Sequence, residues 1–191
     1  MTDTSTDEHP LVRKIDALTE RIGSAVSWLV LAMVLVGAYN AVARYLGRSI
    51  GINLSSNAYL EMQWYLFSLV FLLGAAYTFK HNAHVRVDVL YGRLSKRAQL
   101  WIDLIGTVVF LLPFSIFCLW VSWPSVRNSW AVLEASPDPG GLPRYPIKSM
   151  ILVAFALLVL QGLAEIVRKV RLLRGPPDVD SDGDDASGMP V

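Results

Sequence analysis

Four long apolar runs constrain this chain more than any other feature. They cover about residues 25–45, 60–80, 99–123 and 147–168 of a 191-residue sequence, and each approaches the roughly 17 to 25 residues that a helix needs to cross a bilayer. Lipid offers no partner to a free backbone N–H or C=O, and runs this long lack the alternation of barrel strands. The sequence therefore predicts an all-α integral membrane protein with four transmembrane helices.

The segments outside the runs define the domain organisation. We expect residues 1–9 to be disordered, residues 10–172 to form a four-helix membrane domain, and the acidic tail 173–191 to be disordered by composition. Before the first run, apolar residues recur at helical spacing beside three basic ones. This pattern predicts an N-terminal amphipathic interfacial helix that lies on the membrane surface before the chain turns into the bilayer. The apolar residues are Leu11, Ile15, Leu18, Ile22 and Val26.

The distribution of basic residues predicts how the chain is inserted. Four crossings place the N-terminal segment, the second loop and the tail on one side, which carries twelve of the lysines and arginines, and the other side carries five. Cytoplasmic loops are the ones enriched in Lys and Arg. Both termini are therefore predicted to be cytoplasmic. The five basic residues of the other side are Arg44, Arg48, Arg127, Arg144 and Lys148.

Local signals refine the third and fourth spans. Ser95 precedes the third run and is expected to cap its helix, while Pro113 lies inside that run and is expected to kink it. Glu165 and Lys169 stand four residues apart at the end of the fourth run, which predicts an ion pair along the helix.

The second run contains a seven-residue pattern of the kind that packs helices. Glu61, Ser68 and Ala75 repeat every seven residues, which is the seam spacing of a left-handed helix pair. Trp64 lies near the start of this run, where aromatic side chains occupy the membrane interface. The seam predicts a contact with another helix, in this chain or in a partner.

The charged stretch 81–99 raises the question of a metal or haem site. His81, His84 and Asp88 lie close together, but zinc needs at least three ligands, and haem between helices usually needs a histidine from each of two helices. The remaining histidine is His9, and the single cysteine is Cys118. The tail resembles a calcium loop without its bidentate glutamate. No metal or cofactor is expected, and the sequence carries no protease, lipase or ATP-binding motif.

Two interpretations stay open for the charged residues near the membrane surface. Asp88 is explained as a helix cap and Arg86 as a basic surface residue, or both contact a second subunit. Glu61 likewise either sits ionised at the interface or contacts a partner. We therefore treat Glu61, Trp64, Ser68, Ala75, Arg86 and Asp88 as candidates for a structural or subunit-interface role, with no catalytic or substrate-binding residue assigned.

The second run and the loop after it resemble a known family. The block EMQWYLFSLVFLLGAAYTFKHNAHVRVDVLYGRLSKRAQLWIDLIG, with its HxRVDxL pattern at 84–90, is similar to the small membrane subunit (DctQ-like) of tripartite ATP-independent periplasmic (TRAP) transporters. The ending GLPRYPIKSMILVAFALLVLQGLAEIVRKV also resembles that family, especially its mannitol/chloroaromatic branch. The resemblance covers roughly residues 20–172.

The resemblance implies a non-enzymatic function in the bacterial inner membrane. It implies a four-helix small permease subunit that binds a much larger permease subunit (DctM-like), and a soluble periplasmic substrate-binding protein that delivers organic acids such as carboxylates. Sodium ions drive the import and are handled by the large subunit. Glu61, Trp64, Arg86 and Asp88 map onto the block that carries the resemblance, which implies a role in assembly.

Two other functional hypotheses are weighed against this one. A haem-binding membrane anchor of a respiratory dehydrogenase would need histidines on facing helices, and a stand-alone carrier would need ionisable residues at mid-membrane. Neither feature is present in the four apolar runs.

Overall fold

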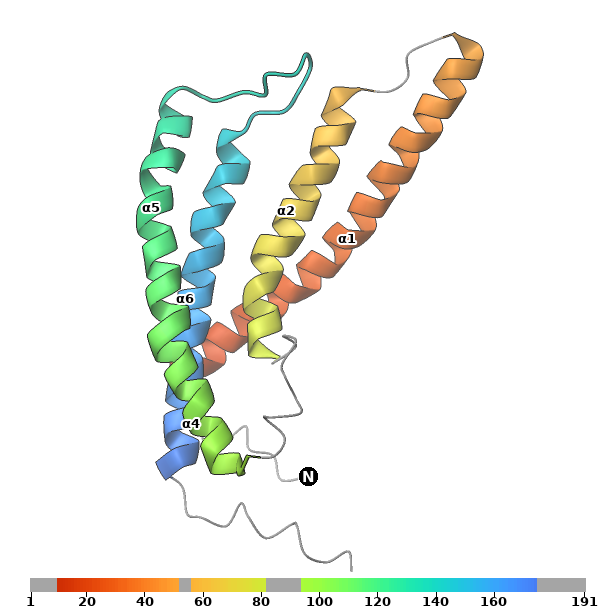
Figure 1. Cartoon of the computed structure of the whole chain (residues 1–191). Coiled ribbons are helices and arrows are strands. Elements are labelled where there is room, and N and C mark those ends of the chain that lie inside the picture. The colour runs from red at the N-terminus through yellow and green to blue at the C-terminus, as the bar shows by residue number, and fades with distance from the viewer. Residues whose placement is uncertain (1–9, 52–55, 82–93, 175–191) are drawn as a thin grey trace, which may run out of the picture.

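The computed structural model describes residues 10–51, 56–81 and 94–174, and four helices in it are long and apolar enough to cross a membrane. The predicted all-α fold with four candidate spans is thus confirmed within the described residues. The helices are drawn in Figure 1. They are α1 (Pro10–Ile50), α2 (Asn57–Lys80), α4 (Lys96–Gly106) continued by a π-helical turn (Thr107–Leu111) and by α5 (Leu112–Ala131), and α6 (Tyr145–Arg174).

The spans form two packed pairs that are joined through α6. α1 packs mainly on α2, and α5 packs on α6, while α2 and α6 make the contact between the pairs. Figure 1 shows the pairs close together at the end where α1 begins and α6 ends, and farther apart toward the α5–α6 loop. α2 and α5 pack little against each other. The two pairs therefore diverge from a common base.

The interior is built from small residues, and large apolar side chains face outward. Ala43, Ala76, Ala154 and Ala164 are buried, while aromatic side chains on α1, on α2 and on the third span are exposed, among them Phe110 at 72%. Helices in lipid gain little from hiding apolar surface and associate through close packing of small residues. Gly23 illustrates this approach, because a Cβ built there would lie 2.2 Å from the Tyr77 ring.

The N-terminal segment departs from the sequence expectation. It does not form a separate interfacial helix that turns before the first span, because α1 continues without a break through both. Asp16 and Thr19, which lie beside the predicted lipid stripe, make hydrogen bonds to α6. Leu11 and Leu18 of that stripe are exposed at 62% and 44%. Polar contacts to α6 hold this segment against the bundle, which the apolar stripe alone did not indicate.

The third span confirms the predicted cap and gives the expected irregularity a definite form. The Ala98 N–H donates to the Ser95 hydroxyl at 3.3 Å. The π-helical turn ends directly before Pro113, and the Leu112 N–H donates to the Thr107 carbonyl five residues back. Proline lacks an N–H and its ring crowds the preceding turn, so a widened turn relieves the conflict. Helix α5 then continues through Pro124 to Ala131.

Candidate functional site

Three of the candidate residues in the charged stretch lie outside the described part of the chain. His84, Arg86 and Asp88 fall in 82–93, so the choice between a helix cap and a subunit contact for Arg86 and Asp88 stays a prediction. His81, at the edge of this stretch, is described. Its Nε2 lies 2.7 Å from Glu20 Oε1, and the Lys80 Nζ donates to the same oxygen at 2.7 Å. These contacts join α2 to α1.

Glu61 holds the loop between α5 and α6. Its side chain is only 3% exposed, and its two carboxylate oxygens accept hydrogen bonds from the Ser136 hydroxyl and the Leu142 N–H. Gly141 lies so close that a Cβ there would be 2.7 Å from Glu61 Oε2. The carboxylate is thus already occupied inside this chain, and Glu61 contributes to folding of the loop.

Other bonds close the same loop into a defined shape. The Tyr65 hydroxyl donates to the Pro143 carbonyl at 3.0 Å, and the Asn57 amide donates to the Pro139 carbonyl at 3.2 Å. Glu134 accepts a hydrogen bond from the Lys148 ammonium, and this contact lowers the pKa of the Glu134 carboxyl. We call this segment, residues 132–144 held by α2 and α6, the latched loop.

Trp64 faces outward, and Ser68, the middle residue of the seven-residue seam, is half-buried. Trp64 is 58% exposed. The Ser68 hydroxyl donates to the Trp64 carbonyl at 2.8 Å, one turn back on the same helix. Neither side chain is used by the described part of the chain to join α2 to another helix, so both remain candidates for contact with lipid or with a partner.

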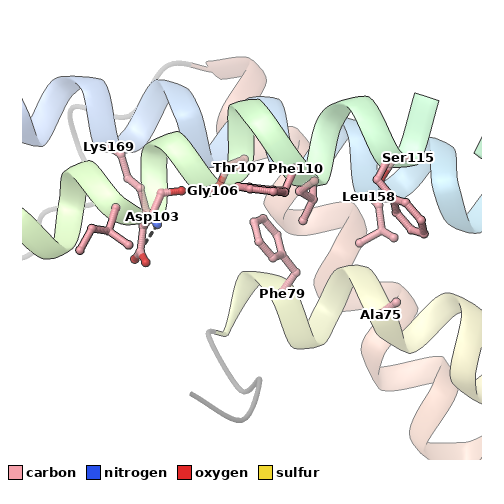
Figure 2. A pocket seen from close by; sticks show the side chains of 12 residues that line it. Ala75, Phe79, Asp103, Gly106, Thr107, Phe110, Ser115, Leu158 and Lys169 are labelled. Atoms are coloured by element: carbon pink, nitrogen blue, oxygen red, sulfur yellow. Dashed lines mark hydrogen bonds and ion pairs between the residues drawn. The ribbon is translucent and has the colours of Figure 1, made fainter. Parts of the chain in front are cut away.

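The lower end of the seam borders a groove between the two helix pairs. Ala75 and Phe79 of α2 form one wall, and Thr107 and Phe110 of the third span form the other, as Figure 2 shows. The groove has a volume of about 660 Å³. The widened π-helical turn forms part of the third-span wall. Ala75 therefore borders the groove between the two helix pairs.

A buried charged cluster closes one end of this groove. Lys169 Nζ lies 2.8 Å from Asp103 Oδ2 and 3.3 Å from Glu165 Oε1, and the side chains of Lys169 and Glu165 are each 7% exposed. The predicted Glu165–Lys169 pair is thus present, but it belongs to a larger set. The Lys169–Asp103 contact at the end of the groove is drawn in Figure 2. It ties α6 to α4.

The cluster extends from α6 to α1. Arg168 donates to Glu165 Oε2 at 2.7 Å and also to the Asp16 carboxylate. The Gln161 amide donates to Asp16 Oδ1 at 3.0 Å and accepts a hydrogen bond from the Thr19 hydroxyl at 2.8 Å. Isolated charges are costly between helices, so mutual pairing is what makes this arrangement tolerable.

Sequence reasoning missed most of this cluster. Asp16 and Thr19 lie in a segment whose apolar residues predicted an interfacial helix and no contact with α6. Asp103 stands far from Lys169 in sequence. One signal was available: Gln161 is a polar residue inside an apolar run, and such residues usually face another helix. Its partners on α1 required the tertiary arrangement.

The described residues form contact surfaces and do not gather into a candidate metal site. Within residues 10–51, 56–81 and 94–174, no group of three or more His, Cys, Asp or Glu side chains is placed to hold a metal ion. The carboxylates of Asp16, Glu61, Asp103 and Glu165 are engaged in hydrogen bonds or ion pairs inside the chain.

Comparison with known proteins gives one family. A family model described as "Tripartite ATP-independent periplasmic transporters, DctQ component" matches residues 33–172. Neither the curated proteins nor the solved structures compared with the chain give a match. The matched range covers α1 from residue 33 onward and all of α2, α4, α5 and the latched loop, and it ends just before the last residues of α6.

Proposed function

We propose that this chain, which belongs to the DctQ component family of the tripartite ATP-independent periplasmic transporters, acts as a non-enzymatic scaffold for a larger permease subunit. Family membership makes it a small permease subunit of such a transporter and a multi-pass protein of the inner membrane. The match over residues 33–172 is the observation that carries the proposal.

The structure supports a role in which the chain contacts a partner subunit and does not itself bind substrate. Large apolar side chains cover the outside of the bundle, and the buried carboxylates are paired within the chain. A carrier normally places ionisable groups at a mid-membrane substrate site. We therefore assign substrate and ion binding to the large permease subunit, with a periplasmic substrate-binding protein delivering an organic acid and a sodium gradient driving its import. The mannitol/chloroaromatic branch remains the preferred subfamily by resemblance.

Copurification and uptake test this proposal together. The tagged chain should recover a multi-spanning permease subunit when the two are expressed together. Vesicles containing both subunits and supplied with binding protein should accumulate an organic acid only when a sodium gradient is present. Vesicles with this chain alone are the matched control and should accumulate none. Uptake by the chain alone would contradict the scaffold function.

The insertion of the chain is a separate part of the proposal. The start of α1 and the end of α6 lie at the same end of the bundle in Figure 1, and the excess of basic residues on that side favours the cytoplasm. Green fluorescent protein fused after residue 191 should fluoresce, and alkaline phosphatase fused there should be inactive. Active phosphatase would place the tail in the periplasm and reverse the orientation.

The haem-anchor alternative gains no supporting contact from the described residues. His81 is engaged with Glu20, and its ring lies against Tyr77 with centroids 4.4 Å apart. An absorption spectrum of the purified chain tests this alternative directly, because a Soret band would revive it.

A further inference from the structure

A polar groove runs along α1 at the end of the bundle that carries the latched loop. It has a volume of about 420 Å³ and lies between the second half of α1 and the start of α2. The α1 wall contains two cations and three small or amide residues, and the α2 wall contains an amide and a leucine. The groove residues used below are Gly37, Ala41, Arg44, Tyr45, Arg48 and Gln63.

The two arginines of this groove have no ionic partner in the described part of the chain. Arg44 and Arg48 are one helical turn apart, both are exposed, and no ion pair joins either of them to a described residue. A guanidinium group stays charged under all physiological conditions and binds a carboxylate or a phosphate through paired N–H donors. Two of them at the edge of an apolar run call for an anion.

The shape of the groove favours a helix over a lipid headgroup as the source of that anion. From Arg48 to Gly37 the groove follows α1 for about 16 Å at the rise of an α-helix. The headgroup region on each side of a bilayer is only about 5 to 7 Å deep. A phospholipid headgroup would meet the arginines, but its acyl chains would place no hydrogen-bonding group beside Gln63 deeper in the groove, whereas a helix can present polar side chains along the whole length.

Small residues in the groove also suit a helix. Gly37 and Ala41 stand four residues apart on α1, and Ala41 is exposed. Small residues at this spacing let the backbone of a second helix approach closely. Gln63 lies against Gly37, with its amide nitrogen 2.8 Å from the position of a built Cβ, so an amide is within the same groove to bond a polar side chain.

A second copy of this chain does not offer the required anion. At this end of the bundle the described carboxylates are Glu61, Glu134 and Asp138. Glu61 is bonded to the latched loop and Glu134 to Lys148. Asp138 lies on the loop outside the membrane span.

From these observations we propose that the groove receives a transmembrane helix of the large permease subunit, and that a carboxylate on that helix pairs with Arg44 and Arg48. The inference rests on the proposed function, because it takes the large subunit as the partner. It adds the face of α1 that is used and the chemistry that the partner helix must carry.

The test uses the full chain expressed with the large subunit. The double variant Arg44→Gln/Arg48→Gln should recover at least tenfold less large subunit than wild type. The variant Arg44→Lys/Arg48→Lys, which keeps both charges, should retain half or more. Arg127→Gln is the matched control, because Arg127 is an exposed arginine at the same end of the bundle on α5, and it should leave recovery unchanged.

Crosslinking makes the test independent of folding of the variants. A photoreactive phenylalanine analogue at Tyr45, an aromatic residue that is 75% exposed at the rim of the groove, should crosslink to the large subunit in the otherwise wild-type chain. A crosslink to a second copy of this chain would overturn the proposal.

Two further outcomes separate the possible failures. Full recovery of the large subunit by the double glutamine variant overturns the proposal, and a simultaneous loss of bound anionic phospholipid would assign the groove to lipid headgroups. Failure of the wild-type chain to recover any large subunit contradicts the proposed function itself, and the inference fails with it.

Discussion

Replacing Lys169 by methionine should destabilise the bundle more than any other single loss of a positive charge in the described chain. Lys169 Nζ is bonded to Asp103 at 2.8 Å and to Glu165 at 3.3 Å, and only 7% of its side chain is exposed. Methionine has a similar length and keeps the apolar stem. The substitution therefore removes the charge and leaves the volume nearly unchanged.

The expected cost follows from what the substitution leaves behind. Removing one member of a buried ion pair costs about 3 to 5 kcal/mol, because the remaining charge stays buried. Here the Glu165 carboxylate keeps its bond to Arg168, and Asp103 is 17% exposed near the end of the bundle. We therefore expect the lower limit, about 3 kcal/mol, which corresponds to more than a hundredfold change in the unfolding equilibrium.

Reversible unfolding by sodium dodecyl sulfate in mixed micelles, followed by circular dichroism, measures this change. Lys148→Met is the matched control, since Lys148 pairs with Glu134 where both side chains are about one-third exposed, at 32% and 31%. Exposed pairs contribute little, so we expect at most a few-fold change. Lys169→Met combined with Asp103→Leu should recover part of the lost stability, because the carboxylate that has lost its bond to Lys169 is then gone.

One result would refute this reasoning. If Lys169→Met shifted the unfolding equilibrium no more than Lys148→Met, then burial of the charged cluster would not decide its contribution. An unchanged penalty in the double variant would show that packing of the lysine stem, and not the loss of the Lys169–Asp103 bond, carries the effect.

Further predictions concern the seam and the latched loop. Ser68→Leu should reduce recovery of the large subunit if the outward face of α2 contacts it, and unchanged recovery would remove that face. Ala75→Leu fills the groove and should alter stability of the isolated chain, measured by thermal unfolding. Gly141→Ala should make the latched loop cleavable by protease, because its Cβ meets Ser136 at 2.5 Å; Gly106→Ala, with nothing within 4 Å, is the control. The Lys148 ammonium lowers the pKa of the Glu134 carboxyl below 4.5. The Glu134–Lys148 pair therefore stabilises the folded chain fully above pH 4.5, and this contribution is lost as pH falls through the lowered pKa of Glu134. Glu134→Gln should therefore reduce stability at neutral pH and match wild type in strong acid.

The sequence predicted the elements of this protein because lipid leaves the backbone few choices. Four apolar runs of spanning length had to form helices, and the cap at Ser95 and the irregularity before Pro113 follow from local backbone chemistry. The pair Glu165–Lys169 could be predicted for the same reason, since helical spacing brings the two side chains together. Each of these features depends on neighbours within a few residues.

The candidate residues show what local sequence could not predict, namely their contacts with distant parts of the chain. Glu61 stands at an interfacial position, and nothing near it in sequence indicates that it bonds a loop beginning some seventy residues later. Glu61, Ser68 and Ala75 were predicted to share one seam, yet Glu61 is buried under the loop, Ser68 is half-buried and bonded within its own helix, and Ala75 borders the groove. Heptad spacing fixes which residues share a helix face and does not say what that face meets.

Composition and periodicity by themselves determined the number of spans and the helical class, because a bilayer forces every backbone hydrogen bond into a local helix. The family resemblance came from particular residues, chiefly the HxRVDxL pattern at 84–90. Only the tertiary structure decided that Asp16, Gln161, Arg168 and Lys169 form one cluster and that α1 is a single helix held to α6. Buried charges must find partners wherever the fold brings them, and those partners lie up to 152 residues apart along the chain.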